Sequence, residues 1–221
     1  MTNEVFMQVL SIKFLPSWWA LSKGQRSRII GMAKEVEKDT EKDVISLKRY
    51  ASLNRPSSLV YWLSSDHTTP LVKFRSSLLS SLSGYAEEDV LLLSVFRPSP
   101  YVKGSFDPRS VLKSPPMKYF VAYPMKKDVS WYLLPFKERE EIMAEHIKMA
   151  KEHPANNGIK SYTTYSFGVA DYEFVVIYEM SSLPEWIEVV ESLREAKARK
   201  WITKEEPLIT GELMDPEFLY S

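Results

Sequence analysis

The chain has 221 residues, with 29 Lys plus Arg, 29 Asp plus Glu, three His and no Cys. The balanced charge creates no field that would attract nucleic acid or an anionic membrane. The lack of cysteine excludes disulfides, thiolate nucleophiles, iron–sulfur clusters and cysteine-ligated zinc. Apolar runs are only strand-length and no signal-peptide pattern is visible, so we expect a cytoplasmic protein without a membrane partner.

Periodicity and turn residues predict the same order of elements in each half of the chain: strand, helix, strand, strand, helix, strand. In the first half, Ser22 is a helix N-cap candidate and Asn54-Arg55-Pro56 marks a turn between two strands. The elements are expected at 5–14, 21–38, 44–53, 58–63, 71–82 and 90–96. In the second half they are expected at 118–123, 136–152, 159–166, 172–180, 184–200 and 208–210.

An internal repeat relates the two halves. The segment at 17–21, SWWAL, returns as SWYLL at 130–134, and Tyr50 and Trp62 align with Tyr165 and Ile177. Shared spacing over several elements indicates two structurally similar halves. The βαββαβ order is ferredoxin-like, and the predicted fold class is α+β, with two such halves forming a dimeric α+β barrel within one chain. We place the halves at 1–97 and 117–221, joined by a proline-rich connector at 98–116.

Two residues of the second half could carry chemistry. The helix at 136–152 places His146 on a mainly apolar stripe, and a neutral histidine there can coordinate iron or be a core residue bonded to backbone or water. Strand alternation places Tyr123 on one face with Tyr119 and Val121, and Pro124 should end strand pairing, leaving Tyr123 at the strand's end. Tyr123 could be an oxidisable side chain or an ordinary core tyrosine.

Basic side chains and sequence motifs narrow these possibilities only slightly. Lys127 and Arg109 could bind carboxylates or phosphates, or could be solvated charges. The sequence lacks the glycine-rich nucleotide motifs, the G-x-S-x-G nucleophile elbow and the H-E-x-x-H zinc motif. Neither a nucleotide-binding enzyme nor a hydrolase of these types is indicated.

A longer pattern resembles the chlorite dismutase-like superfamily, which includes the coproheme decarboxylases. The resemblance covers nearly the whole chain and is strongest between Arg109 and Gly211. It consists of Arg109, Pro116, Tyr119, YPMKK at 123–127, WYLL at 131–134, Glu138-Arg139, MAEH at 143–146, GVADYEF at 168–174 and PLITG at 207–211, together with Trp62 and RPSPY at 97–101 in the first half.

The resemblance implies a haem pocket in the second half only. His146 falls on the proximal haem ligand, and Tyr123 on the tyrosine that coproheme decarboxylases oxidise beside a propionate. Lys127 and Arg109 fall on a nearby lysine and a propionate-binding arginine. The implied cofactor is haem b or iron-coproporphyrin, the implied partner is hydrogen peroxide, and the implied assembly is a homo-oligomer, a pentamer.

The chain departs from the family at the distal position. Counting back from Gly168 places Ser161 where chlorite dismutases have arginine and decarboxylases usually glutamine. Without that cation chlorite dismutation is disfavoured, although a serine can still hydrogen-bond a peroxide. Three hypotheses follow: a peroxide-dependent haem enzyme of the coproheme decarboxylase type, a haem-binding or haem-transfer protein with weak peroxidase activity, and a porphyrin-free structural barrel.

Overall fold

The computed structural model describes residues 4–101 and 107–221, and both halves have the predicted order of elements. The first half contains β1 (Val5–Phe14), α1 (Pro16–Trp19), α2 (Lys23–Thr40), β2 (Ser46–Ser52), β3 (Leu59–Ser65), α3 (Thr68–Ser81) and β4 (Ala86–Phe96). After α4 (Pro108–Leu112), the second half contains β5 (Tyr119–Lys127), α5 (Val129–Leu133), α6 (Phe136–Glu152), β6 (Lys160–Tyr165), β7 (Phe174–Met180), α7 (Leu183–Ser192), β8 (Ile202–Lys204) and β9 (Ile209–Glu212). Four 3₁₀ turns, η1 (Pro154–Asn156), η2 (Leu193–Glu195), η3 (Lys197–Trp201) and η4 (Pro216–Leu219), complete the described elements.

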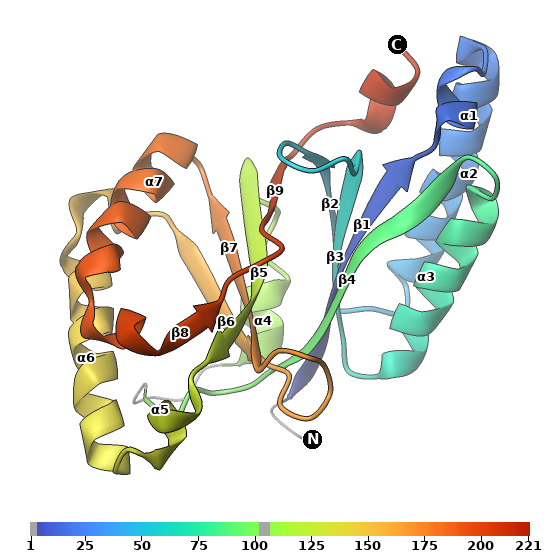
Figure 1. Cartoon of the computed structure of the whole chain (residues 1–221). Coiled ribbons are helices and arrows are strands. Elements are labelled where there is room, and N and C mark those ends of the chain that lie inside the picture. The colour runs from blue at the N-terminus through green and yellow to red at the C-terminus, as the bar shows by residue number, and fades with distance from the viewer. Residues whose placement is uncertain (1–3, 102–106) are drawn as a thin grey trace.

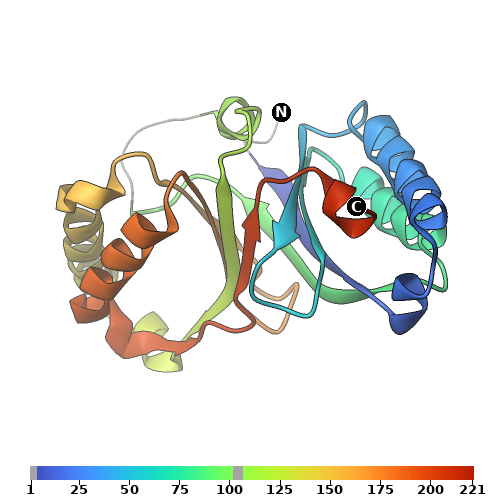
Figure 2. The ribbon, with the colours of Figure 1, turned by 90° about the horizontal axis from the view of Figure 1, so that it is seen from above.

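The strands close into a barrel. The first half has the order β4-β1-β3-β2 and the second half the order β6-β7-β5-β9. The halves join where β4 meets β6 and where β2 meets β9, with Val95 opposite Tyr165 and Ala51 opposite Glu212. Helices cover the two outer sides of this barrel (Figures 1 and 2). The prediction of an α+β barrel built from two ferredoxin-like halves is confirmed.

The repeat holds at the level of strand register. Leu10 on β1 lies opposite Tyr61 on β3, and Tyr123 on β5 lies opposite Val176 on β7. Tyr61 and Val176 are separated by the same number of positions as Trp62 and Ile177. Trp62 and Ile177 both face the barrel interior. Leu10 in the first half is therefore the structural counterpart of Tyr123 in the second.

The two outer layers are filled very differently. The barrel interior is packed with side chains of both halves, including Trp62, Phe120 and Tyr162. Between the first-half sheet and its helices lies a cluster of fifteen buried residues. The corresponding cluster among the described residues of the second half has three buried members, Trp131, Ile142 and Ala198. The apolar layer under α6 and α7 is therefore much thinner than the layer under α2 and α3.

Some local predictions are wrong. Tyr123 does not end its strand, because β5 continues through Pro124, opposite Val175, to Lys127. Since β9 stops pairing at Ala122, a residue without an N–H is tolerated on that side of β5. The helix expected at 184–200 ends at Ser192 and continues as 3₁₀ turns.

Two further differences concern the repeat and the connector. The alignment of Tyr50 with Tyr165 is wrong, because Tyr50 points into the barrel while Tyr165 lies on the outer face, opposite Phe174. The connector predicted at 98–116 contains the short helix α4, whose Leu112 packs in the barrel interior, and its residues 102–106 lie outside the described residues. Within the described ranges, no helix is long and apolar enough to cross a membrane.

Candidate functional site

Three hydroxyl groups meet on the outer face of the second-half sheet. Tyr123 lies on β5, Tyr178 on β7 and Ser161 on β6, where Ser161 pairs directly with Tyr178. The Tyr123 and Tyr178 rings stack with centroids 6.2 Å apart. Trp186 on α7 covers the other part of the Tyr178 ring, with ring centroids 4.2 Å apart. Ser161 is exposed, whereas Tyr123 and Tyr178 are half-buried.

The environment of Tyr123 keeps its phenol protonated. Burial is the main reason that the pKa of Tyr123 lies well above its ordinary value, and the neighbouring Tyr178 raises this pKa further. Arg199 lowers the pKa and Glu205 raises it, by smaller amounts. These two residues are ion-paired, with 2.6 Å between Arg199 Nη1 and Glu205 Oε1. Tyr123 is thus a neutral hydrogen-bond donor at ordinary pH.

His146 lies on α6 and is neutral and incompletely bonded. Burial, together with the nearby Lys127 and Arg199, lowers its pKa. Its Nδ1 atom is buried and has no hydrogen-bond partner among the described residues. A buried polar atom left without a partner costs about 1–3 kcal/mol. A site that completes the bonding of His146 from outside the chain would remove this cost.

The repeat shows what the first half has in place of His146. Arg26 and Ile29 on α2 align with Arg139 and Ile142 on α6, and the same spacing aligns Ala33 with His146. Ala33 is buried in the large first-half cluster. In the second half, Ile142 is the buried residue of α6, and the predicted stripe around His146 is only partly covered.

Lys127 is a buried cation near His146. Its Nζ lies 3.3 Å from the centre of the Trp131 ring and 3.8 Å from Sδ of Met143. Burial lowers the pKa of Lys127 to about 8, against the attraction of Glu173. Glu173 accepts hydrogen bonds from the Lys127 backbone N–H and from the Tyr132 hydroxyl. Lys127 therefore packs with the small cluster that anchors α6, and its positive charge helps to keep His146 neutral.

Arg109 lies apart from the other candidate residues. It is in α4, next to the barrel interior occupied by Leu112. Its Nη2 lies 2.5 Å from Oδ1 of Asp66, which follows β3 in the first half. The structure thus groups Tyr123, Ser161, His146 and Lys127 with the second-half layer, and ties Arg109 to the first half.

Sequence reasoning missed three residues of this region: Tyr178, Trp186 and Arg199. Arg199 is the charge shared by the surroundings of Tyr123 and His146. Trp186 on α7 packs on Tyr178 with ring centroids 4.2 Å apart. Strand alternation could have found Tyr178, since it shares the outer face of β7 with Val176. Arg199 and Trp186 carry no comparable signal, because their positions depend on how α7 and η3 pack.

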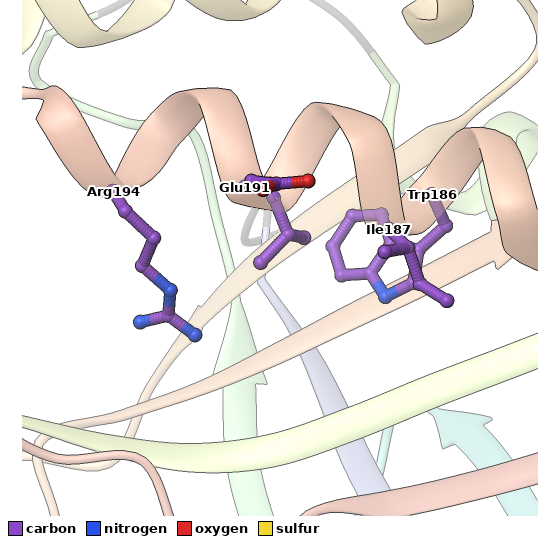
Figure 3. Close-up of a pocket in the computed structure, with 5 residues that line it drawn as sticks. Trp186, Ile187, Glu191 and Arg194 are labelled. Atoms are coloured by element: carbon purple, nitrogen blue, oxygen red, sulfur yellow. The ribbon is translucent and has the colours of Figure 1, made fainter.

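An open hollow follows α7 beside this region. It has a volume of about 330 Å³ and is lined by Trp186, Ile187, Val190, Glu191 and Arg194. Figure 3 shows Trp186 of α7 and Arg194 of η2 extending on the side of the strands. Arg194 also pairs with Glu205, at 3.0 Å. Small-molecule sites generally span roughly 300–1,000 Å³, so the hollow lies at the lower end of that range.

The fold and these residues define a class of protein: a closed α+β barrel of two ferredoxin-like halves, with a histidine and a tyrosine in the outer layer of one half. The family model described as chlorite dismutase matches residues 16–214. The chain belongs to the chlorite dismutase family.

Individual relatives agree with this assignment. The chain is 25% identical over 171 residues to coproheme decarboxylase of Mycolicibacterium smegmatis. The aligned region covers 76% of this chain and 72% of that protein. The chain is 31% identical over 99 residues to coproheme decarboxylase of Staphylococcus saprophyticus, covering 43% of this chain and 35% of that protein. Among solved structures, TA0507, a candidate chlorite dismutase, is 38% identical with a TM-score of 0.90, covering 99% and 98% of the two chains.

Proposed function

We propose that this protein binds an iron porphyrin, haem b or iron-coproporphyrin, in the outer layer of its second half and uses hydrogen peroxide in a reaction of the coproheme decarboxylase type. The observation that carries the proposal is the half-buried, neutral His146 imidazole, whose buried Nδ1 has no described partner. This histidine lies in the half whose apolar layer is thin. The two coproheme decarboxylases among its relatives support the choice of substrate.

The residues present fit such a group. A neutral imidazole has a lone pair available for iron, and the low pKa of His146 keeps it neutral near pH 7. Lys127 and Arg199 are cations near His146 that can bind propionates through charge-assisted hydrogen bonds. We also propose that Arg109 binds a propionate, which requires this residue to share or exchange its bond to Asp66 of the first half.

The bound iron would supply the redox chemistry with peroxide, and the chain's residues would direct it. Tyr123, half-buried and protonated, would lose an electron and a proton and pass the oxidation to a propionate carboxylate. Ser161 is exposed on the same sheet face and can hydrogen-bond a peroxide, more weakly than a longer or charged side chain. Because Ser161 carries no charge, we do not propose chlorite dismutation.

A titration with haem and coproheme, followed by addition of peroxide, tests the proposal. We expect the Soret band to shift on binding, and His146→Ala to weaken binding at least about tenfold. Peroxide should then cause loss of propionate mass from coproheme, and Tyr123→Phe should abolish this loss while the Soret shift remains. His67→Ala is the control, since His67 is exposed in the first half.

The other outcomes identify the rival functions. No Soret shift with either porphyrin would leave a porphyrin-free barrel and overturn the proposal. A His146-dependent shift without loss of propionate mass would instead indicate a haem-binding or haem-transfer protein. The short, uncharged side chain of Ser161 is the observation that favours this second candidate.

A further inference from the structure

Two arginines that follow α7 share one carboxylate. Nη1 of Arg194 lies 3.0 Å from Oε2 of Glu205, and Nη1 of Arg199 lies 2.6 Å from Oε1 of the same residue. Each arginine therefore takes one oxygen, and neither closes the bidentate bond that a guanidinium and a carboxylate can form. Within the described residues, Nε and Nη2 of both guanidinium groups have no hydrogen-bond partner. With Glu205, this arginine pair keeps one positive charge in excess and several unused donors.

The arginine pair is accessible from the hollow beside α7. The hollow has a volume of about 330 Å³, and its lining places Arg194 next to the apolar side chains of Trp186, Ile187 and Val190 (Figure 3). The Arg194 side chain is 53% exposed, and Glu191, the other charged residue of the lining, is also exposed. An apolar wall that ends at unused guanidinium donors suits a flat apolar ring with a carboxylate at its edge.

The arginine pair also lies beside the helix that carries His146. The turn η3, which contains Arg199, is held against α6, because the Lys197 backbone N–H donates to the Glu145 carboxylate at 3.1 Å. Glu145 immediately precedes His146 on α6. Arg199 is in addition the charge common to the surroundings of Tyr123 and His146. A porphyrin held by His146 would therefore bring one edge towards the arginine pair.

We propose that Arg194 and Arg199 together bind a propionate that iron-coproporphyrin has and haem b lacks. Haem b has vinyl groups at positions where iron-coproporphyrin has propionates, and a vinyl group accepts no hydrogen bond from a guanidinium. The arginine pair would thus decide between the two porphyrins that the proposed function names. The inference rests on that proposed function, in which one of these porphyrins is bound at His146.

The positions of the other cations favour a porphyrin with propionates at more than one edge. Lys127 lies with Trp131, outside the lining of the hollow, and Arg109 pairs with Asp66 of the first half. Together with the arginine pair, these residues form three separate cationic places. Haem b, whose two propionates lie at one edge of the ring, would leave at least one of the three without a carboxylate. Iron-coproporphyrin has enough propionates for all of them.

Titration of the porphyrin-free protein with iron-coproporphyrin and with haem b, followed at the Soret band, tests the inference. We expect iron-coproporphyrin to bind at least about tenfold more tightly, the effect of one charge-assisted bond in a partly exposed place. Arg194→Gln should weaken binding of iron-coproporphyrin about tenfold and change binding of haem b by less than about twofold. The matched control is Lys200→Gln, which removes an exposed positive charge next to Arg199 on η3.

The metal-free porphyrins separate the arginine pair from the iron ligand. Coproporphyrin and protoporphyrin differ in the same side groups as the two iron porphyrins but form no iron bond to His146. Quenching of tryptophan fluorescence measures their binding. We expect Arg194→Gln to weaken binding of coproporphyrin alone, and His146→Ala to leave the ratio of the two affinities unchanged.

The outcomes distinguish this inference from the proposed function. If Arg194→Gln weakens binding of both iron porphyrins equally, has no effect, or acts no more strongly than Lys200→Gln, the role of the arginine pair is overturned while porphyrin binding stands. If neither iron porphyrin binds to the unchanged protein, the proposed function is overturned, and this inference with it.

Discussion

At the level of single residues, the two halves differ most where the second half carries its candidate chemistry. Ala33 and Leu10 are buried in the first-half cluster, at the positions of His146 and Tyr123. Each replacement exchanges an apolar side chain for one with a polar atom that must be bonded. The Tyr123 ring stacks on Tyr178, whereas His146 Nδ1 has no described hydrogen-bond partner. These two side chains, more than the fold, distinguish the second half from the first.

Lys127 gives a prediction for stability against pH. The unfolded chain holds the lysine proton up to about pH 10.4, whereas the folded protein releases it near pH 8. The unfolded state thus binds more protons between these values, and stability should rise as the pH increases from about 8 to about 10. Lys127→Met should remove this rise and increase the free energy of unfolding at pH 7 by up to about 3 kcal/mol.

Urea unfolding at a series of pH values between 7 and 10 measures this effect. Lys126→Met is the control, because Lys126 is the exposed neighbour of Lys127 on the same strand. A rise in stability that persists in Lys127→Met would show that another group causes it. Equal stability of Lys127→Met and the unchanged protein at pH 7 would show that charging Lys127 in its buried position is not costly.

At the level of elements, sequence periodicity predicted the regular helices and strands but not the irregular segments. Helix α6 has the predicted bounds, and α2 begins after the predicted N-cap, where Ser22 and Gln25 form a capping box. The continuation of β5 past Pro124 and the break in α7 depend on which neighbours pair or pack there. Local sequence does not contain this information. The same holds for Tyr178, whose importance arises from partners on two other elements.

Helix α6 should be less protected than α2 until a porphyrin binds. Four side chains of α2 are buried, whereas Ile142 is the buried side chain of α6. Fewer buried contacts mean a lower cost of local opening. By hydrogen–deuterium exchange, amides of α6 should exchange faster than those of α2, and coproheme should slow α6 exchange at least about tenfold. Unchanged α2 exchange is the internal control; α6 exchange equal to that of α2 without porphyrin would contradict the prediction.

At the level of the whole molecule, a buried ion pair links the halves inside the barrel. Lys48 on β2 lies 2.8 Å from Glu179 on β7, and the side chains are 2% and 0% exposed. Tyr50 and Tyr162 donate hydrogen bonds to the same carboxylate. The two charged residues are 131 positions apart in the chain, so the sequence offered no sign of their contact. Only closure of the barrel brings them together.

Removing one partner of this pair should destabilise the whole barrel. Glu179→Gln leaves the Lys48 ammonium buried without its counter-charge, and breaking such a pair typically costs about 3–5 kcal/mol. We expect Glu179→Gln to lose about this much free energy of unfolding, and Lys48→Met combined with Glu179→Gln to recover part of it. Chemical denaturation measures both, with Glu87→Gln at the exposed Lys13–Glu87 pair as a control that should change stability by less than about 1 kcal/mol. Because both halves contribute to the pair, the loss should appear in one cooperative transition; separate unfolding of the two halves, or a loss no larger than the control, would show that the ion pair does not couple them.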